Sequence, residues 1–363
     1  MTDPTPTPGI HHVTCVASDP QRTLDFWAET LGLRLVKRSV NQDDPGTYHF
    51  FFADAEGIPG TSVTFFPWAD MPSGSVGTGQ VARTAFRVPA GSLDYWEERF
   101  DRYGVDYDDR VERFGGGTRG DSADASSAER SAADRSSGRS PREDATGPRA
   151  ETALPLRDPD GLPVELAAVE VPEDDPTVPW TAFVPESAAI RGFHSVALRL
   201  ADPAPTTDLL RTMGLTAVGT GRTPDDRTGE RTRFAAAGPV GTYVDVVPAV
   251  EGGRQGGGTV HHVAFRTPTD EDQSAMRSAV RSAGVRPTRR IDRHWFRSVH
   301  FREPGGVLFE LATDGPGYDS DEPLDDLGGR LVLPGEFGDR REGVEAGLPE
   351  VTVPRPPSAA ADD

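Results

Sequence analysis

The segment that decides the fold begins with Thr259-Val260-His261-His262-Val263 and ends with Gly305-Gly306-Val307-Leu308-Phe309-Glu310-Leu311. Both runs are typical of short apolar strands, and the stretch 270–283 between them has helical spacing that ends at Gly284. A carboxylate inside an apolar strand is costly to bury unless it is paired or binds a metal. Imidazole and carboxylate on two neighbouring strands therefore indicate either half of a metal site or a salt-bridged core pair.

The same strand–helix–strands unit occurs four times along the chain. The first copy opens with Gly9-Ile10-His11-His12-Val13-Thr14, and the third with Gly192-Phe193-His194-Ser195-Val196. Self-similarity at fixed offsets is the signature of a repeated structural unit. We therefore predict an α+β fold of four β-α-β-β-β modules, over residues 9–68, 80–170, 190–250 and 259–315.

The modules fall into two pairs of similar sequence. Modules one and three both end in a Gly-Thr-x-Val run closed by proline, at residues 60–67 and 241–248. Modules two and four share Ala-Phe-Arg near the start and Glu-Leu at the end. A two-module domain has thus been duplicated, giving domains 9–170 and 190–315. In such a duplication two modules close into one curved sheet, so we expect two cups; the repeats leave open which modules pair.

Two segments of the chain, and the end of a third, are expected to be disordered. From Gly115 to Ala153 there is no Val, Ile, Leu, Met or aromatic residue. Such a segment buries too little apolar surface to offset its ordering entropy, which predicts a disordered insertion over 115–150. Residues 1–8 are predicted to be a disordered N-terminus. Residues 316–363 are predicted to be an extension that packs loosely or not at all after about Pro349.

Composition excludes several classes of protein. The formal net charge is −20 and, of 38 basic side chains, only Lys37 is a lysine. This balance indicates a surface adapted to high salt and argues against nucleic-acid binding, which needs a basic footprint. The single cysteine, Cys15, excludes an internal disulfide and is expected to be a small buried hydrophobe. No signal peptide or membrane span is evident, so we expect a cytoplasmic protein; a homo-oligomer is compatible with the sequence.

The repeat also aligns candidate site residues. In one pairing, modules one and four bring together His12, His262 and Glu310, with Thr64 at the fourth position. Two histidines and one carboxylate are typical of non-haem Fe(II) oxygenases. The other cup would then hold an internal ion pair, formed by Arg83, His194, Glu165 and Asp245. In the alternative pairing, the triad is His194, His262 and Glu310, with Asp245 nearby.

Five blocks of sequence resemble the hydroquinone ring-cleaving dioxygenases of the vicinal oxygen chelate (glyoxalase/extradiol) superfamily. The resemblance covers nearly all of residues 9–350 apart from the insertion, and its paired His-His blocks are specific. The blocks are Gly9-Ile10-His11-His12-Val13-Thr14, Asp44-Pro45-Gly46-Thr47-Tyr48-His49, Pro59-Gly60-Thr61, Gly258-Thr259-Val260-His261-His262-Val263-Ala264-Phe265 and Asp292-Arg293-His294-Trp295-Phe296-Arg297-Ser298.

The resemblance implies Fe(II), less often Mn(II), held by His12, His262 and Glu310, with modules one and four paired. It also implies that four residues surround the substrate: Thr14, His11, His261 and Arg293. In these roles His11 and His261 handle protons or hydrogen bonds, Thr14 orients bound oxygen or water, and Arg293 holds an anionic ring oxygen.

Strand alternation gives a more cautious interpretation of some of these residues. It places Thr14 on the same face as His12, but it turns His11 and His261 away from an ideal cup, where they would pack under the helices. His49, among aromatic residues, is expected to be a core histidine. His300 is a departure, because the family usually has tyrosine there.

The sequence therefore predicts an Fe(II)-dependent extradiol-type dioxygenase that opens a para-hydroquinone or related aromatic diol with O2. One alternative is a glyoxalase-type lyase or isomerase using Zn(II) or Ni(II). That enzyme needs a fourth protein ligand, and Thr64 is a poor one. The other alternative is a metal-free protein of the same fold that binds aromatic ligands.

Overall fold

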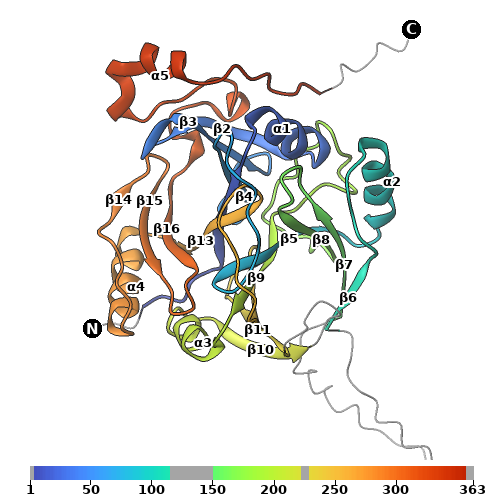
Figure 1. Cartoon of the computed structure of the whole chain (residues 1–363), viewed down its shortest axis with the longest axis vertical. Coiled ribbons are helices and arrows are strands. Elements are labelled where there is room, and N and C mark those ends of the chain that lie inside the picture. The colour runs from blue at the N-terminus through green and yellow to red at the C-terminus, as the bar shows by residue number, and fades with distance from the viewer. Residues whose placement is uncertain (1–3, 115–149, 222–228, 357–363) are drawn as a thin grey trace, which may run out of the picture.

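The computed structural model describes residues 4–114, 150–221 and 229–356, which form two curved sheets with helices on the outside (Figure 1). The first sheet has eight strands and combines modules one and four. In spatial order its strands are β14 (Ile291–Asp292), β15 (Phe296–Arg302), β16 (Leu308–Pro316), β13 (Thr259–Thr267), β1 (Ile10–Ala17), β4 (Ser62–Pro67), β3 (Asp44–Ala53) and β2 (Arg34–Asn41).

The second sheet also has eight described strands and combines modules two and three. The α+β fold with two cups is thus confirmed, and the alternative pairing of modules one with two and three with four is wrong. In spatial order the strands are β10 (Thr216–Gly221), β11 (Arg231–Ala235), β12 (Tyr243–Pro248), β9 (Phe193–Leu200), β5 (Gln80–Pro89), β8 (Pro163–Val169), β7 (Glu151–Arg157) and β6 (Val111–Arg113).

Each module carries its expected helix. These are α1 (Pro20–Leu24), which continues as the π-helix η1 (Asp25–Thr30), α2 (Leu93–Tyr103), α3 (Pro203–Thr212) and α4 (Asp270–Ser282). Helix α4 starts with a capping box, in which Thr269 and Asp272 exchange side chain–backbone hydrogen bonds. Met276 and Val280 are fully buried on its inner face, as the helical spacing predicted. Among the described residues, no helix has both the length and the apolar character needed to cross a bilayer.

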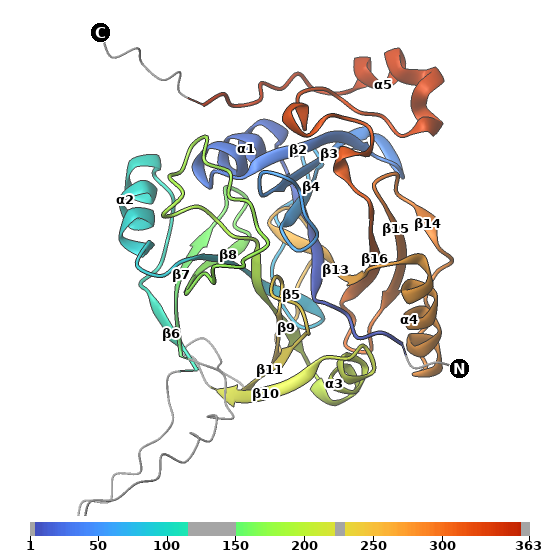
Figure 2. The same cartoon turned by 180° about the vertical axis from the view of Figure 1, so that it is seen from behind.

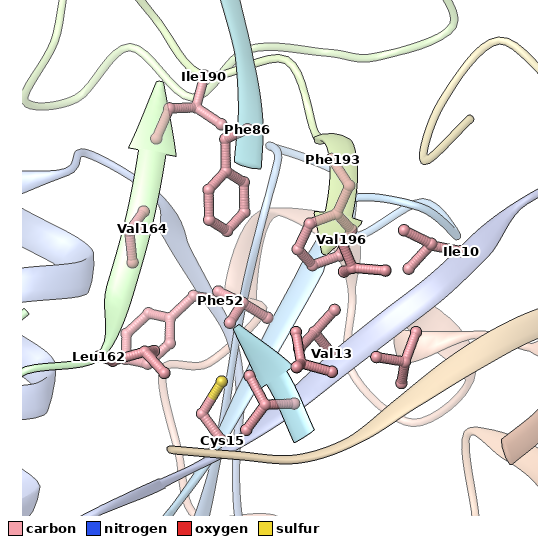
Figure 3. Packing of buried hydrophobic residues seen from close by; sticks show 14 of the residues in the cluster. Ile10, Val13, Cys15, Phe52, Phe86, Leu162, Val164, Ile190, Phe193 and Val196 are labelled. Atoms are coloured by element: carbon pink, nitrogen blue, oxygen red, sulfur yellow. The ribbon is translucent and has the colours of Figure 1, made fainter. Parts of the chain in front are cut away.

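The main core lies where the two sheets face each other (Figure 3). Along β1, Val13 and Cys15 point into this core while His12 and Thr14 point into the cup, which is the two-residue alternation of a strand. Each fully buried large apolar side chain contributes roughly 1.5–3 kcal/mol of stability. Cys15 is completely buried among these side chains, so its expected role as a small hydrophobe is confirmed.

Both ends of the described chain are packed more tightly than we expected. Thr7 is buried, and its hydroxyl donates to the Arg266 carbonyl over 2.8 Å, so residues 4–8 do not behave as the predicted disordered N-terminus. Beyond Pro349, the Thr352 amide donates to the Gln21 side chain over 2.8 Å. The predicted insertion at 115–149 and the last residues of the tail, 357–363, lie outside the described residues.

The C-terminal extension, residues 317–356, follows the last strand of module four. It crosses the end of the first sheet at β2 and β3, as Figure 2 shows from behind. A short parallel bridge joins Arg38 of β2 to Leu331, and the Val332 amide donates to the Arg38 carbonyl over 2.9 Å. Its helical turns are η2 (Tyr318–Ser320), η3 (Leu324–Asp326), η4 (Gly335–Arg340) and α5 (Arg341–Gly347).

Candidate metal centre

Three buried side chains with ligand chemistry meet in the middle of the first sheet. They are His12 on β1, His262 on β13 and Glu310 on β16, and their donor atoms all lie within 4.8 Å of one another. The Nε2 atoms of the two histidines are 3.3 Å apart, and Glu310 Oε2 lies 3.0 Å from His262 Nε2 and 3.8 Å from His12 Nε2. Among the described residues, this is the one group of three or more such side chains close enough to share an ion.

Two β-bulges explain how both histidines of each His-His pair reach this region. The register pairs Ile10 with Phe265 and His12 with Ala264, which leaves His11 as an extra residue on β1. On the opposite strand a second irregularity, between the pairs Thr14–His262 and Cys15–Val260, leaves His261 unpaired. A bulge breaks the alternation of a strand and re-aims the neighbouring side chains. The prediction from ideal alternation, that both turn away under the helices, is therefore wrong for His261, which lines the cavity, while His11 lies beside His12 outside the cavity wall.

The bulged histidines stand beside the two histidines of the triad. His11 Nδ1 lies 2.9 Å from His12 Nδ1, and His261 Nδ1 lies 2.8 Å from His262 Nδ1. Each contact uses the ring nitrogen that faces away from Glu310, so each bulged imidazole fixes the tautomer and orientation of its neighbour. His261 also lines the cavity in front of the triad, whereas His11 is not part of the cavity wall.

Burial and charge leave the triad ready to receive a cation. Burial lowers the pKa of His12 well below its usual value and also lowers the pKa of His262, so both imidazoles are neutral at pH 7. Burial alone would raise the pKa of Glu310, but His300 and His12 outweigh it and hold this pKa well below the usual range. Two neutral imidazoles and one carboxylate therefore need lose no proton before binding a metal.

The side chains next to the triad form a hydrogen-bonded row. Thr14 Oγ1 lies 3.0 Å from His262 Nε2 and 2.8 Å from Thr64 Oγ1, and Thr64 in turn lies 2.9 Å from His49 Nε2. Thr14 is thus adjacent to the triad, as strand alternation predicted. His49 differs from the expected core histidine, because it lines the cavity while its ring packs on Phe51 at 3.9 Å between centroids.

His300, the departure from the family pattern, contacts the triad directly. It is the strand partner of Glu310, and its Nε2 lies 2.8 Å from Glu310 Oε2. Burial lowers the pKa of His300, but the charge of Glu310 and its hydrogen bond raise it by more, so the net shift is upward. The sequence around His300, between the core residues Val299 and Phe301, matches no motif that would indicate a partner. The contact with Glu310 is therefore revealed only by the pairing of β15 with β16.

A cavity of about 270 Å³ opens in front of the triad. Arg293 lines it toward the surface, where its guanidinium donates to Gln42 Oε1 over 3.1 Å and to Asp43 Oδ2 over 3.3 Å. The volume and the flat apolar walls suit one aromatic ring. The aromatic lining consists of Phe51, Phe66, Trp68, Trp295 and Phe296.

The second cup holds ion pairs at the equivalent positions. Arg83 Nη1 lies 2.8 Å from Glu165 Oε1, and Arg113 also contacts this carboxylate. Asp245 accepts from Arg233 over 2.7 Å and from Arg231 over 3.2 Å. The prediction of an internal ion pair in this cup is confirmed.

The strand register corrects one part of the predicted alignment. The bulge in the second sheet skips His194, between the pairs Ala85–Ser195 and Phe86–Phe193. His194 therefore corresponds to the bulged His11, and Ser195 stands where the first cup has His12. The prediction that aligned His194 with His12 and His262 is wrong by one residue, because the Gly-x-His starts at Gly9 and Gly192 align His194 with His11. His194 instead pairs with Glu151 at 2.7 Å.

We expect the bulged histidine His11 to support metal affinity. Replacing His11 with alanine should weaken metal binding about 10- to 100-fold, because outer partners of ligating histidines have effects of this size. Metal dissociation constants from chelator competition would measure the change. His194→Ala, at the equivalent bulge of the other sheet, is the matched control and should leave the affinity unchanged. Equal affinities in the two variants would mean that the Nδ1 contact does not support the ligand.

Comparison with known proteins agrees with the fold. The family model described as "Glyoxalase/Bleomycin resistance protein/Dioxygenase superfamily" matches residues 9–166 and again residues 164–311. MhqO of Bacillus subtilis strain 168, named as a candidate ring-cleaving dioxygenase, is 37% identical over 345 residues, covering 94% of this chain and 96% of that protein.

Two further matches extend the comparison. The chlorohydroquinone/hydroquinone 1,2-dioxygenase of Sphingobium indicum is 28% identical over 335 residues, covering 90% of this chain and 91% of that protein. The crystal structure of a candidate dioxygenase from Bacillus subtilis strain 168 has a TM-score of 0.81 and 36% identity, covering 97% of this chain and 99% of that one. The chain therefore belongs to the glyoxalase/bleomycin resistance protein/dioxygenase superfamily, and its relatives within it are named as ring-cleaving dioxygenases.

Proposed function

We propose that this protein is an Fe(II)-dependent, extradiol-type dioxygenase that opens the ring of a para-hydroquinone. The observation that carries the proposal is the triad His12, His262 and Glu310 at the end of an aromatic-lined cavity. Two histidines and one carboxylate, with further coordination positions open, are the donor set of non-haem Fe(II) oxygenases. The name of the Sphingobium indicum relative supports hydroquinones as the class of substrate.

The donor chemistry of the triad fits a divalent first-row metal. His12 and His262 would present Nε2 and Glu310 would present one carboxylate oxygen, giving a site with net charge −1 before the metal binds. Bound Fe(II), or Mn(II) in its place, would supply the redox chemistry that lets the aromatic ring react with O2. The rival glyoxalase-type enzyme would want a fourth protein ligand, and a threonine hydroxyl is a poor one. Thr64 is the candidate, and its hydroxyl is already held between Thr14 and His49.

The remaining cavity residues would bind and orient the diol. His261 lines the cavity, and burial lowers its pKa to about 3, so its neutral imidazole would exchange hydrogen bonds with a ring hydroxyl. Arg293 would stabilise the oxyanion that forms when the distal hydroxyl loses its proton. Thr14 would hold oxygen or water beside the triad. For His11 we propose support of His12, in place of the predicted contact with substrate.

The overall reaction consumes one diol and one O2. The ring bond between a hydroxyl-bearing carbon and its neighbour breaks, and both atoms of O2 enter the product, a ring-opened acid or acyl compound. The electrons that reduce O2 come from the ring itself, so no external reductant is needed. The apolar walls formed by side chains such as Phe51 and Trp295 would keep water from the reacting carbon.

Oxygen uptake tests the proposed function directly. Protein reconstituted anaerobically with Fe(II) and assayed at high salt should consume O2 with hydroquinone and methylhydroquinone, at a kcat/KM about 10-fold or more above that for catechol. We expect this preference because the para oxygen can reach Arg293, and a hydrogen bond to a charged group has an effect of this order. Arg293→Met should reduce the ratio of kcat/KM for hydroquinone to kcat/KM for catechol. Absence of uptake with every diol would contradict the proposal.

A further inference from the structure

We propose that the C-terminal extension acts as a clasp that ties together the two edges of the first sheet and thereby positions the substrate wall. The clasp consists of Lys37 on β2 and of Asp321 and Glu322 in the extension. The clasp would hold the side chains of Arg293 and Trp295 in place, and both of these line the cavity. The inference rests on the proposed function, because that function identifies what the wall holds, but the clasp itself is tested independently below.

Lys37 is unusual both in the sequence and in the structure. It is the single lysine among 38 basic side chains, and it is completely buried. Its ammonium group contacts the carboxylates of Asp321 and Glu322. A lysine ammonium is a compact charge with three donors, so it can contact both carboxylates at once. The single lysine of the chain thus lies at the point where the extension meets β2.

Asp321 connects this lysine to the cavity wall. One carboxylate oxygen contacts Lys37, and the other accepts hydrogen bonds from Trp295 Nε1 over 3.0 Å and from His294 Nε2 over 2.8 Å. The Lys37 ammonium also lies 5.6 Å from the centre of the Trp295 ring, within the range of a cation–π contact. One side chain of the extension thus holds a β2 residue and two residues next to β14.

These contacts join strands that the sheet itself does not join. β2 and β14 are the two opposite edges of the first sheet, with six strands between them. The segment after β14 carries Arg293 and Trp295 into the cavity on either side of His294, whose φ of +77° lies in the left-handed region. Such a conformation is disfavoured for a non-glycine residue and persists only where its surroundings hold it. The hydrogen bond from His294 to Asp321 provides part of that support.

Neighbouring contacts seat the extension over the same cup. The Tyr318 hydroxyl lies 3.0 Å from Ser62 Oγ, and the Tyr318 ring packs on Phe51 with 5.4 Å between centroids. The Arg34 guanidinium donates to the Asp325 carbonyl over 2.9 Å. Pro334 of the extension reaches the cavity and forms part of its lining. The extension is therefore a component of the substrate cavity, although it lies outside the four modules.

Loss of the clasp should loosen the wall without removing the metal ligands. Lys37 and Asp321 touch neither the triad nor the proposed position of the ring, so they are positioning residues. We expect Asp321→Asn and Lys37→Met to raise KM for methylhydroquinone about 10-fold while kcat changes much less, because binding of the ring is lost in both ground and transition states. Metal content should stay at the level of the unmodified protein.

Two measurements on the full-length, metal-loaded protein test the clasp. Anaerobic calorimetry should show that Asp321→Asn binds methylhydroquinone more weakly, with a dissociation constant about 10-fold larger than that of the unmodified protein. Hydrogen exchange, which requires no diol, should be faster in the peptide that contains residues 291–297. The matched control is Asp175→Asn. It alters a buried ion pair, 3.0 Å long, between Asp175 in the loop before β9 and Arg87 on β5, and it should change neither quantity.

The outcomes separate the clasp from the proposed function. Unchanged exchange over 291–297 in folded Asp321→Asn would overturn the clasp, even if the protein cleaves hydroquinones. Faster exchange with an unchanged diol dissociation constant would overturn its role in positioning the substrate. Faster exchange in a protein that consumes no O2 with any diol would contradict the proposed function and still support the clasp.

Discussion

Replacing His12 with alanine is expected to remove the bound metal and the O2 uptake together. His12 is one of three donors, and the other two, His262 and Glu310, are 3.0 Å apart and can pair with each other once it is gone. Two protein donors rarely retain a divalent first-row metal in a protein site, where three or four are usual. Metal per chain after reconstitution and desalting should therefore fall from one equivalent to background.

The control for this change is His194→Ala in the other cup. His194 is a buried histidine of similar exposure, but it pairs with Glu151 and stands beside ion pairs instead of other donors. Metal content and O2 uptake should be retained in His194→Ala. Loss of metal in both variants, or in His194→Ala alone, would contradict the assignment of the metal to the first cup.

Replacing Asp245 with alanine is expected to destabilise the fold by about 3–5 kcal/mol, because removal of one partner leaves buried charge uncompensated. Asp245 is 1% exposed and accepts from Arg233 over 2.7 Å and from Arg231 over 3.2 Å, both of which are themselves buried. Urea unfolding monitored by circular dichroism would measure the change in the free energy of unfolding.

An exposed ion pair provides the comparison for this second prediction. Asp208 lies 2.9 Å from Arg211 on the surface of α3, and Asp208→Ala should cost less than about 0.5 kcal/mol, because water already screens such a pair. The metal content of folded Asp245→Ala should equal that of the unmodified protein. If Asp245→Ala and Asp208→Ala lowered the free energy of unfolding by similar amounts, burial would add nothing to the contribution of the ion pairs in the second cup.

Much of the fold follows from the sequence because the repeats are strict. The Gly-Thr-x-Val endings and the Ala-Phe-Arg starts are sufficient to identify four modules. The apolar alternation of β1 assigns Val13 to the core and His12 to the cup, as observed. The residues leave open which modules share a sheet, because both pairings place His262 near Glu310. Only the ladder between β1 and β13 decides it.

The local errors of sequence reasoning arise at the bulges. A bulge shifts the register by one residue and changes which side chains share a face, yet it leaves no mark in the pattern of apolar residues. For this reason ideal alternation assigns His261 to the wrong face and does not predict the contact between His11 and His12. The error over His194 has another source, because the Gly-x-His starts of modules one and three already align His194 with His11. Bulges are frequent next to active sites, so a His-His pair on a central strand is a useful signal of one.

The clasp could not be found from sequence for a different reason. Lys37 and Asp321 are separated by 284 positions, and neither belongs to a repeat or a motif. The sequence predicts an extension over 316–363 that packs loosely or not at all after about Pro349, but it does not indicate what Asp321 contacts. Its attachment relies on individual contacts, of which the hydrogen bond from Trp295 to Asp321 is one. A single lysine in an arginine-rich chain was the available clue.

The fate of molecular oxygen tests the central claim most directly. Fe(II)-loaded protein would be given methylhydroquinone under ¹⁸O₂, the product reduced at once with borohydride to prevent exchange with water, and its mass determined. The proposed function predicts a ring-opened product that contains two labelled oxygen atoms, and no such product from His12→Ala. A ring-opened product without label, or an intact ring after O2 consumption, would contradict a dioxygenase and with it the function proposed for the triad.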